Sequence, residues 1–425
     1  MITLLIALTF ILLIVGAPIY ISLLLSSMIT MLLFTSTDPM VLIQRTFGGI
    51  DKFVLMSLPF YILAANAMDV GGLSKRILRW AQALVGYLHG GLAMTVQTAA
   101  MFFGALSGSS PATVAAIGKI MYPEMLKQKY PKSFSTGLIL ESGSISLIIP
   151  PSITLILYAS ATNTSVGSLF MAGLSAGIIF GLIILIYIYA VSKIKKIPKG
   201  EPFNIPVLWQ STKNAAWSLG IPIIIIVGIS MGIFTPTEAA GVSALYAIFI
   251  GMAVYREITL KKLFLICKSS AIMSAQIMIL IGAASAFGWL LTVGQGPQLL
   301  AEFLNSNFNS SLMFLLFLNI VLLILGMFLD ASIALIVIAP LVLPTAISLG
   351  IDPIHLGIVM VLNLAIGTFT PPFGLNIFVG KSVMGLEVHE MIPGIMRFLI
   401  VALAGLLLIT YLPTLSLFLP NMIFN

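Results

Sequence analysis

The sequence predicts an all-α polytopic membrane protein built from two inverted-topology repeats. Of its 425 residues, 60% are hydrophobic and only 8% are charged, a composition typical of a membrane protein. A motif that breaks an apolar segment occurs twice, as IIPPS at 148–152 and as FTPPFG at 369–374. Basic residues gather in a few loops, and this bias orients the segments between them.

Matched positions elsewhere support the duplication. The two proline pairs are 221 residues apart (371 − 150). A run that begins at Gly104 matches one that begins at Gly326, at a spacing of 222 (326 − 104). Pro18 matches Pro236 at a spacing of 218 (236 − 18). Three similar spacings predict two homologous halves.

The first half covers residues 1–192 and contains two unusual elements between ordinary spans. A Ser/Gly run splits residues 91–125 into two arms of about 15 residues, and crossing a ~30 Å core takes about 20, so a re-entrant hairpin is predicted. A proline pair breaks the next helix. In order, the predicted elements are spans at 2–15, 18–36 and 52–71, an amphipathic interfacial arm helix at 73–86, the hairpin at 91–125, a broken helix at 133–162, and a span at 166–192.

The second half covers residues 215–425 and repeats this order after a basic, cytoplasmic linker at 193–214. Its hairpin has its tip near 329–333. The predicted elements are spans at 215–234, 237–255 and 271–293, an arm helix at 297–308, a hairpin at 311–346, a broken helix at 354–380, and a span at 394–419.

The basic clusters orient the two halves. They follow the first hairpin, fill the linker and precede the third span of the second half: Lys119, Lys127, Lys129, Lys132, Lys193, Lys195, Lys196, Lys199, Arg256, Lys261, Lys262 and Lys268. With these clusters in the cytoplasm, both termini are periplasmic, and the two hairpins enter from opposite sides. In this orientation Arg45 and Lys52 lie near the periplasmic surface, against the tendency of basic residues to be cytoplasmic. The net charge of +7 fits loop bias in a lipid bilayer, and we expect no nucleic-acid partner.

The breaks and tips are the candidate functional sites. Carbonyls freed from helical hydrogen bonds, together with hydroxyls, can bind a small cation, and helix N-termini suit an anion. The alternative is that these glycines and prolines only kink or pack helices. A carboxylate at the apolar tip, Asp330, predicts either ion or proton coupling or a cap of the tip. Glu141, one turn before the first break, fits equally a partner of that site or an acid that faces the lumen.

Several chemistries are disfavoured. A single cysteine, Cys267, allows no intrachain disulfide, and the three histidines have no metal-ligand spacing. No P-loop is present. An intramembrane enzyme using Glu141 and Asp330 as a carboxylate pair lacks a nucleophile or metal cluster. We therefore expect no enzyme, no catalytic residue and no cofactor.

The paired signatures Gly143–Ser152 (GSISLIIPPS) and Gly367–Asn376 (GTFTPPFGLN) resemble those of the large membrane subunit of tripartite ATP-independent periplasmic (TRAP) transporters. The resemblance implies an elevator-type, sodium-driven transporter of the ion-transporter superfamily in the bacterial inner membrane. It implies a small four-helix membrane subunit and a periplasmic protein that delivers an organic acid, such as a sialic acid or a C4-dicarboxylate. A free-standing sodium/carboxylate symporter of the same superfamily is the alternative.

The tips, the breaks and the resemblance together define candidate sites. The first sodium site comprises Gly104, Ser107, Ser110, Ser146, Ile149 and Pro151, and the second comprises Gly326, Asp330, Gly367, Thr370 and Phe373. The candidate substrate contacts are Ser109, Ser152, Ser332 and Asn376. The family commonly has glycine at the position of Ser146, so this serine implies a clash or an added hydroxyl ligand.

Overall fold

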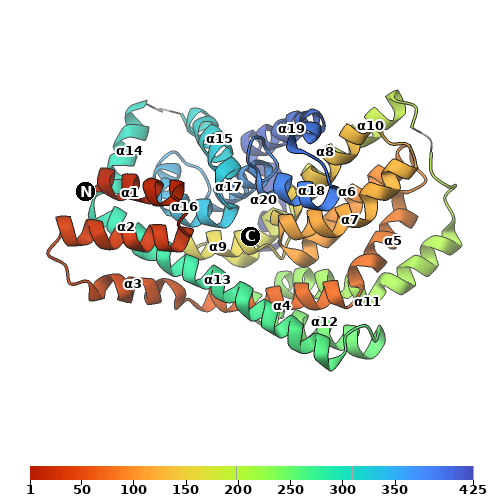
Figure 1. Ribbon diagram of the computed structural model, residues 1–425, viewed down its shortest axis with the longest axis horizontal. Coiled ribbons are helices and arrows are strands. Elements are labelled where there is room, and N and C mark those ends of the chain that lie inside the picture. Colours follow the sequence, from red (N-terminus) through yellow and green to blue (C-terminus); the bar gives the residue numbers. More distant parts are fainter. Residues whose placement is uncertain (198, 308–309, 425) are drawn as a thin grey trace.

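A computed structural model describes residues 1–197, 199–307 and 310–424, which form a helical bundle without β-strands in these ranges (Figure 1). The helices of the first half are α1 (Ile2–Ile14), α2 (Ile19–Phe34), α3 (Met40–Ile50), η1 (Phe53–Met56), α4 (Ser57–Val70), α5 (Leu73–Val85), α6 (Gly91–Ser107), α7 (Ser110–Lys127), α8 (Lys132–Ser142), η2 (Ser144–Leu147), α9 (Ile153–Thr162) and α10 (Val166–Ile194). Residue 198 of the predicted linker lies outside the described residues.

The second half continues the bundle. Its helices are α11 (Ile205–Ser230), α12 (Pro236–Phe249), η3 (Ile250–Val254), α13 (Leu260–Val293), α14 (Gly296–Asn307), α15 (Ser311–Phe328), α16 (Ala331–Ser348), α17 (Pro353–Gly367), α18 (Leu375–Met384), α19 (Val388–Tyr411) and α20 (Pro413–Phe424). Residue 308, the last of the predicted second arm helix, lies outside the described residues.

Many helices are long and apolar enough to cross a membrane. By length and composition, eight such helices lie in the described part of the chain: Phe53–Val70, Val166–Ile194, Ile205–Ser230, Pro236–Val254, Leu260–Val293, Ser311–Phe328, Ala331–Ser348 and Val388–Tyr411. A multi-pass membrane protein is therefore supported. The shorter helices on either side of the proline pairs, α8, α9, α17 and α18, are not among them.

Helices from the two halves pack against each other at the centre of the bundle. Helix α7 packs against α18, α8 against α19, and α9 against α16. Glycine allows the closest of these approaches, because a Cβ on Gly137 would lie 2.4 Å from the carbonyl oxygen of Gly394. This interlocking brings the two proline-containing breaks into one central region (Figure 1).

A second layer lies along one side of this centre. The long helix α13 packs against α2, α3 and α4, and α4 packs against α12 (Figure 1). A separate apolar cluster holds the N-terminal helices to α13, with Leu5, Leu23, Phe287 and Leu290 among its buried members. The outer face is rich in exposed apolar side chains such as Ile14 and Ile186, as a lipid-facing surface requires.

Several elements differ from the sequence prediction. Helix α3 was not predicted, because its amphipathic pattern is short. Helix α11 begins at Ile205 inside the predicted linker, after Asn204 caps its first turn. Helix α13 begins at Leu260, because its exposed lysines extend the helix beyond the apolar run. The predicted span 394–419 is two helices, since Pro413 starts α20.

Candidate functional site

The first break separates α8 from α9. After Ser142 the chain forms a single 3-10 turn and a cis Pro150–Pro151 bond, and α-helix resumes at Ile153. Ser152 is buried and caps α9, because its hydroxyl accepts a hydrogen bond from the Leu155 amide (3.2 Å). The same hydroxyl donates to the Leu147 carbonyl. Ser152 thus uses its side chain to shape the break.

The tip of the first hairpin lies against this break. Gly108 joins α6 to α7 with φ of +57°, a conformation that favours glycine. A Cβ on Gly108 would lie 2.9 Å from the Pro151 carbonyl oxygen, and one on Gly104 would lie 2.7 Å from the Ser146 Cα. Tip and break therefore meet backbone to backbone, and larger residues would separate them.

Hydroxyl groups gather at this contact. The Ser107 Oγ lies 3.0 Å from the Thr113 Oγ1, which lies 2.7 Å from the Ser146 Oγ. Thr113 also donates to the Ser109 carbonyl (3.0 Å). Ser107 and Ser146, from two elements of the sequence, are thus joined through Thr113. Sequence reasoning missed Thr113, although it is a polar residue one turn beyond the tip in an otherwise apolar arm.

A small, mostly apolar cavity lies beside the same tip. Its volume is about 80 Å³, and Ser107 and Ser109 line it together with Asn66 and Asp69 of α4. Sequence reasoning did not select Asn66 or Asp69. Ile149 and Pro151 of the first predicted sodium site lie buried in the adjoining break.

The second hairpin and the second break make a matching contact. Helix α17 ends at Gly367, the bond Pro371–Pro372 is cis, and α18 begins at Leu375. A Cβ on Gly367 would lie 2.7 Å from the Cα of Gly326 in α15. The Thr370 hydroxyl donates to the Ile366 carbonyl (2.8 Å), a carbonyl in the last turn of α17. Again glycine permits direct backbone contact.

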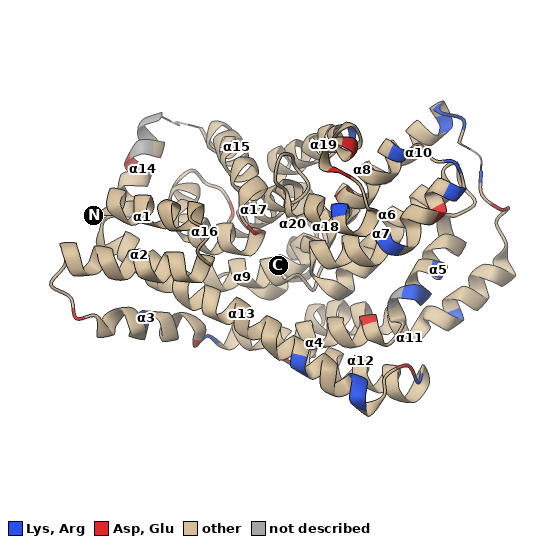
Figure 2. Ribbon diagram, in the orientation of Figure 1, with Lys and Arg blue, Asp and Glu red and all other residues tan. Residues whose placement is uncertain are grey.

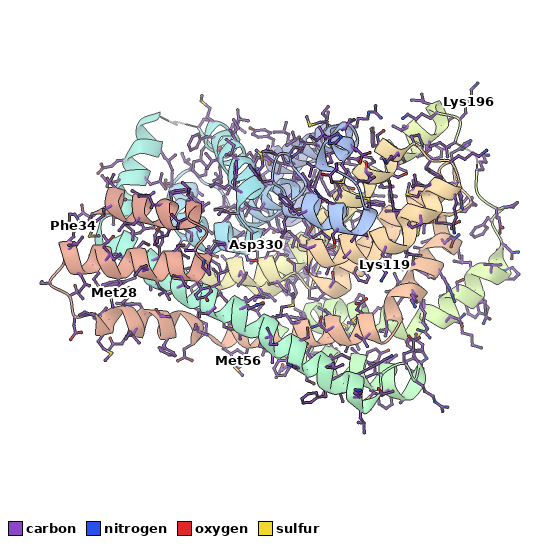
Figure 3. The ribbon with its side chains drawn as sticks, viewed as in Figure 1. Met28, Phe34, Met56, Lys119, Lys196 and Asp330 are labelled. Atoms are coloured by element: carbon purple, nitrogen blue, oxygen red, sulfur yellow. The ribbon has the colours of Figure 1, made fainter. Side chains whose placement is uncertain are left out.

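The other residues predicted for this site lie nearer the surface. Asp330 is exposed, and its Oδ1 accepts a hydrogen bond from the Ser332 amide (2.8 Å) at the start of α16. The cap expected for Asp330 is therefore present, whereas its coupling to an ion or proton stays a prediction. Phe373 is exposed, and its ring lies 5.2 Å from that of Phe328 near the tip. Figure 3 places Asp330 far from Lys119 and Lys196.

A buried polar cluster joins the two halves. The Ser110 Oγ lies 3.0 Å from the Oδ1 of Asn376 and 2.8 Å from its Nδ2. That Nδ2 also lies 3.1 Å from the Leu140 carbonyl oxygen and 3.1 Å from the Thr368 Oγ1. Gly143 makes room for this approach, since its Cβ would lie 2.8 Å from the Ser110 carbonyl oxygen. The first hairpin and both breaks thus meet at Asn376.

Glu141 lies buried beside the same region. Neither of its carboxylate oxygens has a hydrogen-bond partner among the described residues, and the hydroxyl of Ser144, near the carboxyl, likewise has none there. The side-chain amide of Gln97, on the neighbouring α6, is buried and unpartnered among those residues as well. Leaving such groups unpaired costs about 1–3 kcal/mol each. This region therefore contains buried polar atoms that form no hydrogen bond with the described residues.

Known proteins are similar to this sequence over nearly its full length. Residues 6–415 match the family described as "Tripartite ATP-independent periplasmic transporter, DctM component". The chain is 41% identical to a C4-dicarboxylate TRAP transporter large permease of Pseudomonas aeruginosa, over 93% of each chain. It is 34% identical to a sialic acid TRAP transporter large permease of Vibrio cholerae, over 97% of this chain and 96% of that one.

One solved structure shows a similar fold. It is the Alcanivorax borkumensis YdaH transporter, which is 13% identical, with a TM-score of 0.63 over 89% of this chain and 90% of that one. At this identity the likeness concerns the fold alone.

Proposed function

Because this chain belongs to the family of large membrane subunits of TRAP transporters, we propose that it moves a small organic acid across the bacterial inner membrane, driven by sodium ions. Its relatives are transporter permeases, and the chain is a permease rather than an enzyme. The observation that carries the sodium proposal is the hydroxyl cluster at the first tip–break contact.

This cluster has the chemistry of a sodium site. Small hard cations prefer oxygen ligands, and the hydroxyls of Ser107 and Ser146 meet that of Thr113, beside the Ser109 carbonyl of the tip. The second site uses the contact between Gly326 and Gly367, with Thr370 and the Asp330 region alongside. In each, a hairpin tip meets a helix that has lost its regular hydrogen bonds.

The proposed substrate site uses the beginnings of helices. Ser109 directly precedes α7 and Ser152 caps α9, while Ser332 and Asn376 lie in the first turns of α16 and α18. Helix N-termini carry partial positive charge and free amides, which suit a carboxylate. Three of the relatives are named for acids, which are C4-dicarboxylate, sialic acid and 2,3-diketo-L-gulonate, and another is named for ectoine.

The proposal includes partners and motion. A small membrane subunit and a periplasmic binding protein complete the transporter, and the family supports both in general terms. An isethionate permease of Oleidesulfovibrio alaskensis, named DctMQ, is longer than this chain, which spans 64% of it.

We propose that the two halves are inverted repeats with periplasmic termini. The hairpins and broken helices move as one body, linked through α5 and α14 to the outer helices.

Reconstitution tests this proposal. With the small subunit and the binding protein in proteoliposomes, an inward sodium gradient is expected to drive uptake of a C4-dicarboxylate or a sialic acid. Replacing sodium by potassium should stop this uptake. Sodium-driven uptake by the chain alone would instead establish the free-standing symporter, and uptake that ignores sodium would refute the coupling.

Ser146 provides a test of the first sodium site. A Ser146→Gly variant loses one hydroxyl of the cluster and is expected to need about tenfold more sodium for half-maximal uptake, the equivalent of about 1.4 kcal/mol. Its maximal rate should change less, because glycine fits the space beside Gly104. Sodium titration of uptake measures both quantities. The control is Ser27→Ala, a buried serine in α2 whose hydroxyl bonds, among the described residues, only to the Leu23 carbonyl. An equal shift in both variants contradicts the assignment.

A further inference from the structure

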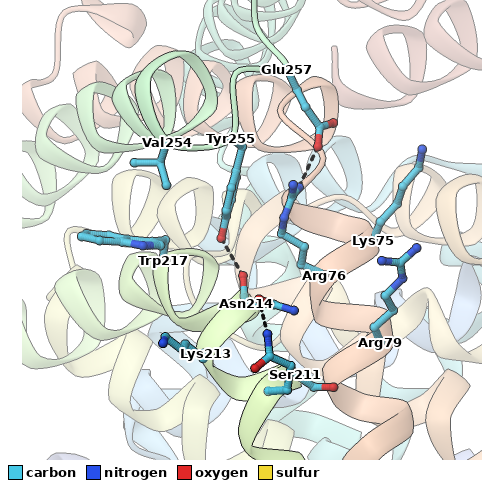
Figure 4. A pocket seen from close by; sticks show the side chains of 11 residues that line it. Lys75, Arg76, Arg79, Ser211, Lys213, Asn214, Trp217, Val254, Tyr255 and Glu257 are labelled. Atoms are coloured by element: carbon cyan, nitrogen blue, oxygen red, sulfur yellow. Dashed lines mark hydrogen bonds and ion pairs between the residues drawn. The ribbon is translucent and has the colours of Figure 1, made fainter. Parts of the chain in front are cut away.

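A basic cavity lies where α5 and α11 meet the segment that follows η3 (Figure 4). Its volume is about 650 Å³. It is lined by Lys75, Arg76, Arg79, Gln210, Ser211, Lys213, Asn214, Trp217, Val254, Tyr255 and Glu257. None of these residues belongs to the tips or the breaks, so the transport site does not account for the cavity.

The only carboxylate that lines this cavity is already paired. Glu257 Oε1 accepts from the Arg76 guanidinium at 2.8 Å, and this guanidinium also lies 3.7 Å from the centre of the Tyr255 ring. Arg76 donates to the Gly72 carbonyl as well (2.8 Å). These contacts fix Glu257 against the start of α5, and it is not free to neutralise other cations.

Three cations around the cavity remain uncompensated. Lys75, Arg79 and Lys213 are exposed, and within the described residues none of them has an ion-pair partner. Lys75 and Arg79 come from α5 and Lys213 comes from α11, so the three charges border the cavity from two helices (Figure 4). The Ser211 hydroxyl and the Asn214 side-chain amide, which also line the cavity, are hydrogen-bond donors. Lysine, arginine and amide donors together are the usual ligands of a phosphate group.

The surroundings point to a phosphate that carries acyl chains. Trp217 and Val254 line the cavity and are 49% and 38% exposed, and both belong to helices that can cross a membrane. Lys and Arg residues gather at this end of the molecule, over α5, α7, α10, α11 and the start of α13 (Figure 2). Under the proposed orientation this is the cytoplasmic surface, where anionic headgroups attract basic side chains. A soluble phosphate compound without an apolar group would make no favourable contact with Trp217 and Val254.

We propose that this cavity binds the headgroup of an anionic phospholipid from the cytoplasmic leaflet. The lipid phosphate lies among Lys75, Arg79 and Lys213, and an acyl chain follows Trp217. Since the ligand bridges α5 and α11, it holds the arm helix against an outer helix. The membrane orientation rests on the proposed function, whereas the binding itself does not depend on transport.

Lipid binding to the purified full chain tests this inference. Fluorescent phosphatidylglycerol should exchange into nanodisc-embedded wild-type protein with at least tenfold preference over phosphatidylcholine. A Lys75→Gln/Arg79→Gln/Lys213→Gln variant should lose that preference while keeping its melting temperature. A Lys193→Gln/Lys195→Gln/Lys196→Gln variant removes the same charge at the end of α10 and should keep the preference.

Four outcomes would overturn the proposal. The cavity variant retains the preference for phosphatidylglycerol, or both triple variants lose it equally. Inorganic phosphate at low millimolar concentration displaces the lipid, which assigns the cavity to a soluble phosphate compound. The cavity variant binds lipid normally but no longer co-purifies with the small subunit, which assigns the surface to a protein. None of these readouts measures acid uptake, so failure here leaves the proposed function standing.

Discussion

A Gly367→Ala variant is expected to lose roughly 10- to 100-fold of its sodium-driven uptake, because overpacking a close contact typically costs about 1–3 kcal/mol. The added Cβ would lie 2.7 Å from the Cα and the carbonyl carbon of Gly326. These are backbone atoms in the last turn of α15, and they cannot rotate away as a flexible side chain can. The second hairpin must therefore move off the second break, and the oxygen groups of that site separate.

The control for this prediction is a glycine without neighbours. Gly241 lies in α12, and a Cβ built there meets nothing within 4 Å. Gly241→Ala should transport at the wild-type rate and gain slightly in helix stability. Initial uptake rates, normalised to the amount of folded protein in the membrane, compare the two variants. Equal rates for both would mean that the Gly326–Gly367 contact has no role in transport.

An Asn376→Leu variant is expected to reduce uptake to background. Leucine has the same number and branching of side-chain heavy atoms as asparagine but removes the hydrogen bonds to Ser110, Leu140 and Thr368. The buried partners are left unpaired at about 1–3 kcal/mol each, enough to part the first hairpin from the second break. Uptake and thermal unfolding of the detergent-solubilised protein together measure the effect.

A double-mutant cycle tests whether this loss comes from the cluster. Ser110→Ala and Asn376→Leu share one contact, so their combined destabilisation should be smaller than the sum by about 0.5–3 kcal/mol. Ser27→Ala, in α2, serves as the matched partner, because the Ser27 hydroxyl bonds within its own helix, to the Leu23 carbonyl. Its effect should add to that of Asn376→Leu. If both pairs are additive, the Ser110–Asn376 contact contributes nothing measurable.

Local sequence signals predicted the breaks well, because proline and glycine act on their own backbone. The proline pairs lie between α8 and α9 and between α17 and α18, within the segments expected to lose regular helix. The run at 107–111 likewise lies where α6 gives way to α7. Membership of the transporter family followed from the doubled signature and is confirmed by relatives over nearly the full chain. These features need no knowledge of tertiary contacts.

The partners of each polar residue could not be predicted in the same way. Ser110 and Asn376 are 266 residues apart and meet only because α7 packs against α18. Thr113 links Ser107 to Ser146 through a contact between two separate elements. The sequence allowed two roles for Asp330, coupling to an ion or proton and capping the tip. The cap depends only on a local hydrogen bond, and the structure shows that bond. Pairing across the fold is a property of packing, which sequence spacing does not encode.

Equilibrium binding of radioactive sodium to the purified chain tests most directly whether the two tip–break contacts hold the coupling ions. Two ions should bind saturably to each wild-type chain, against an excess of potassium. A Thr113→Val/Ser146→Gly variant, which removes two hydroxyls of the first cluster, should bind only one ion in the same concentration range. Unchanged binding by this variant, or no saturable binding by the wild type, would contradict the assignment.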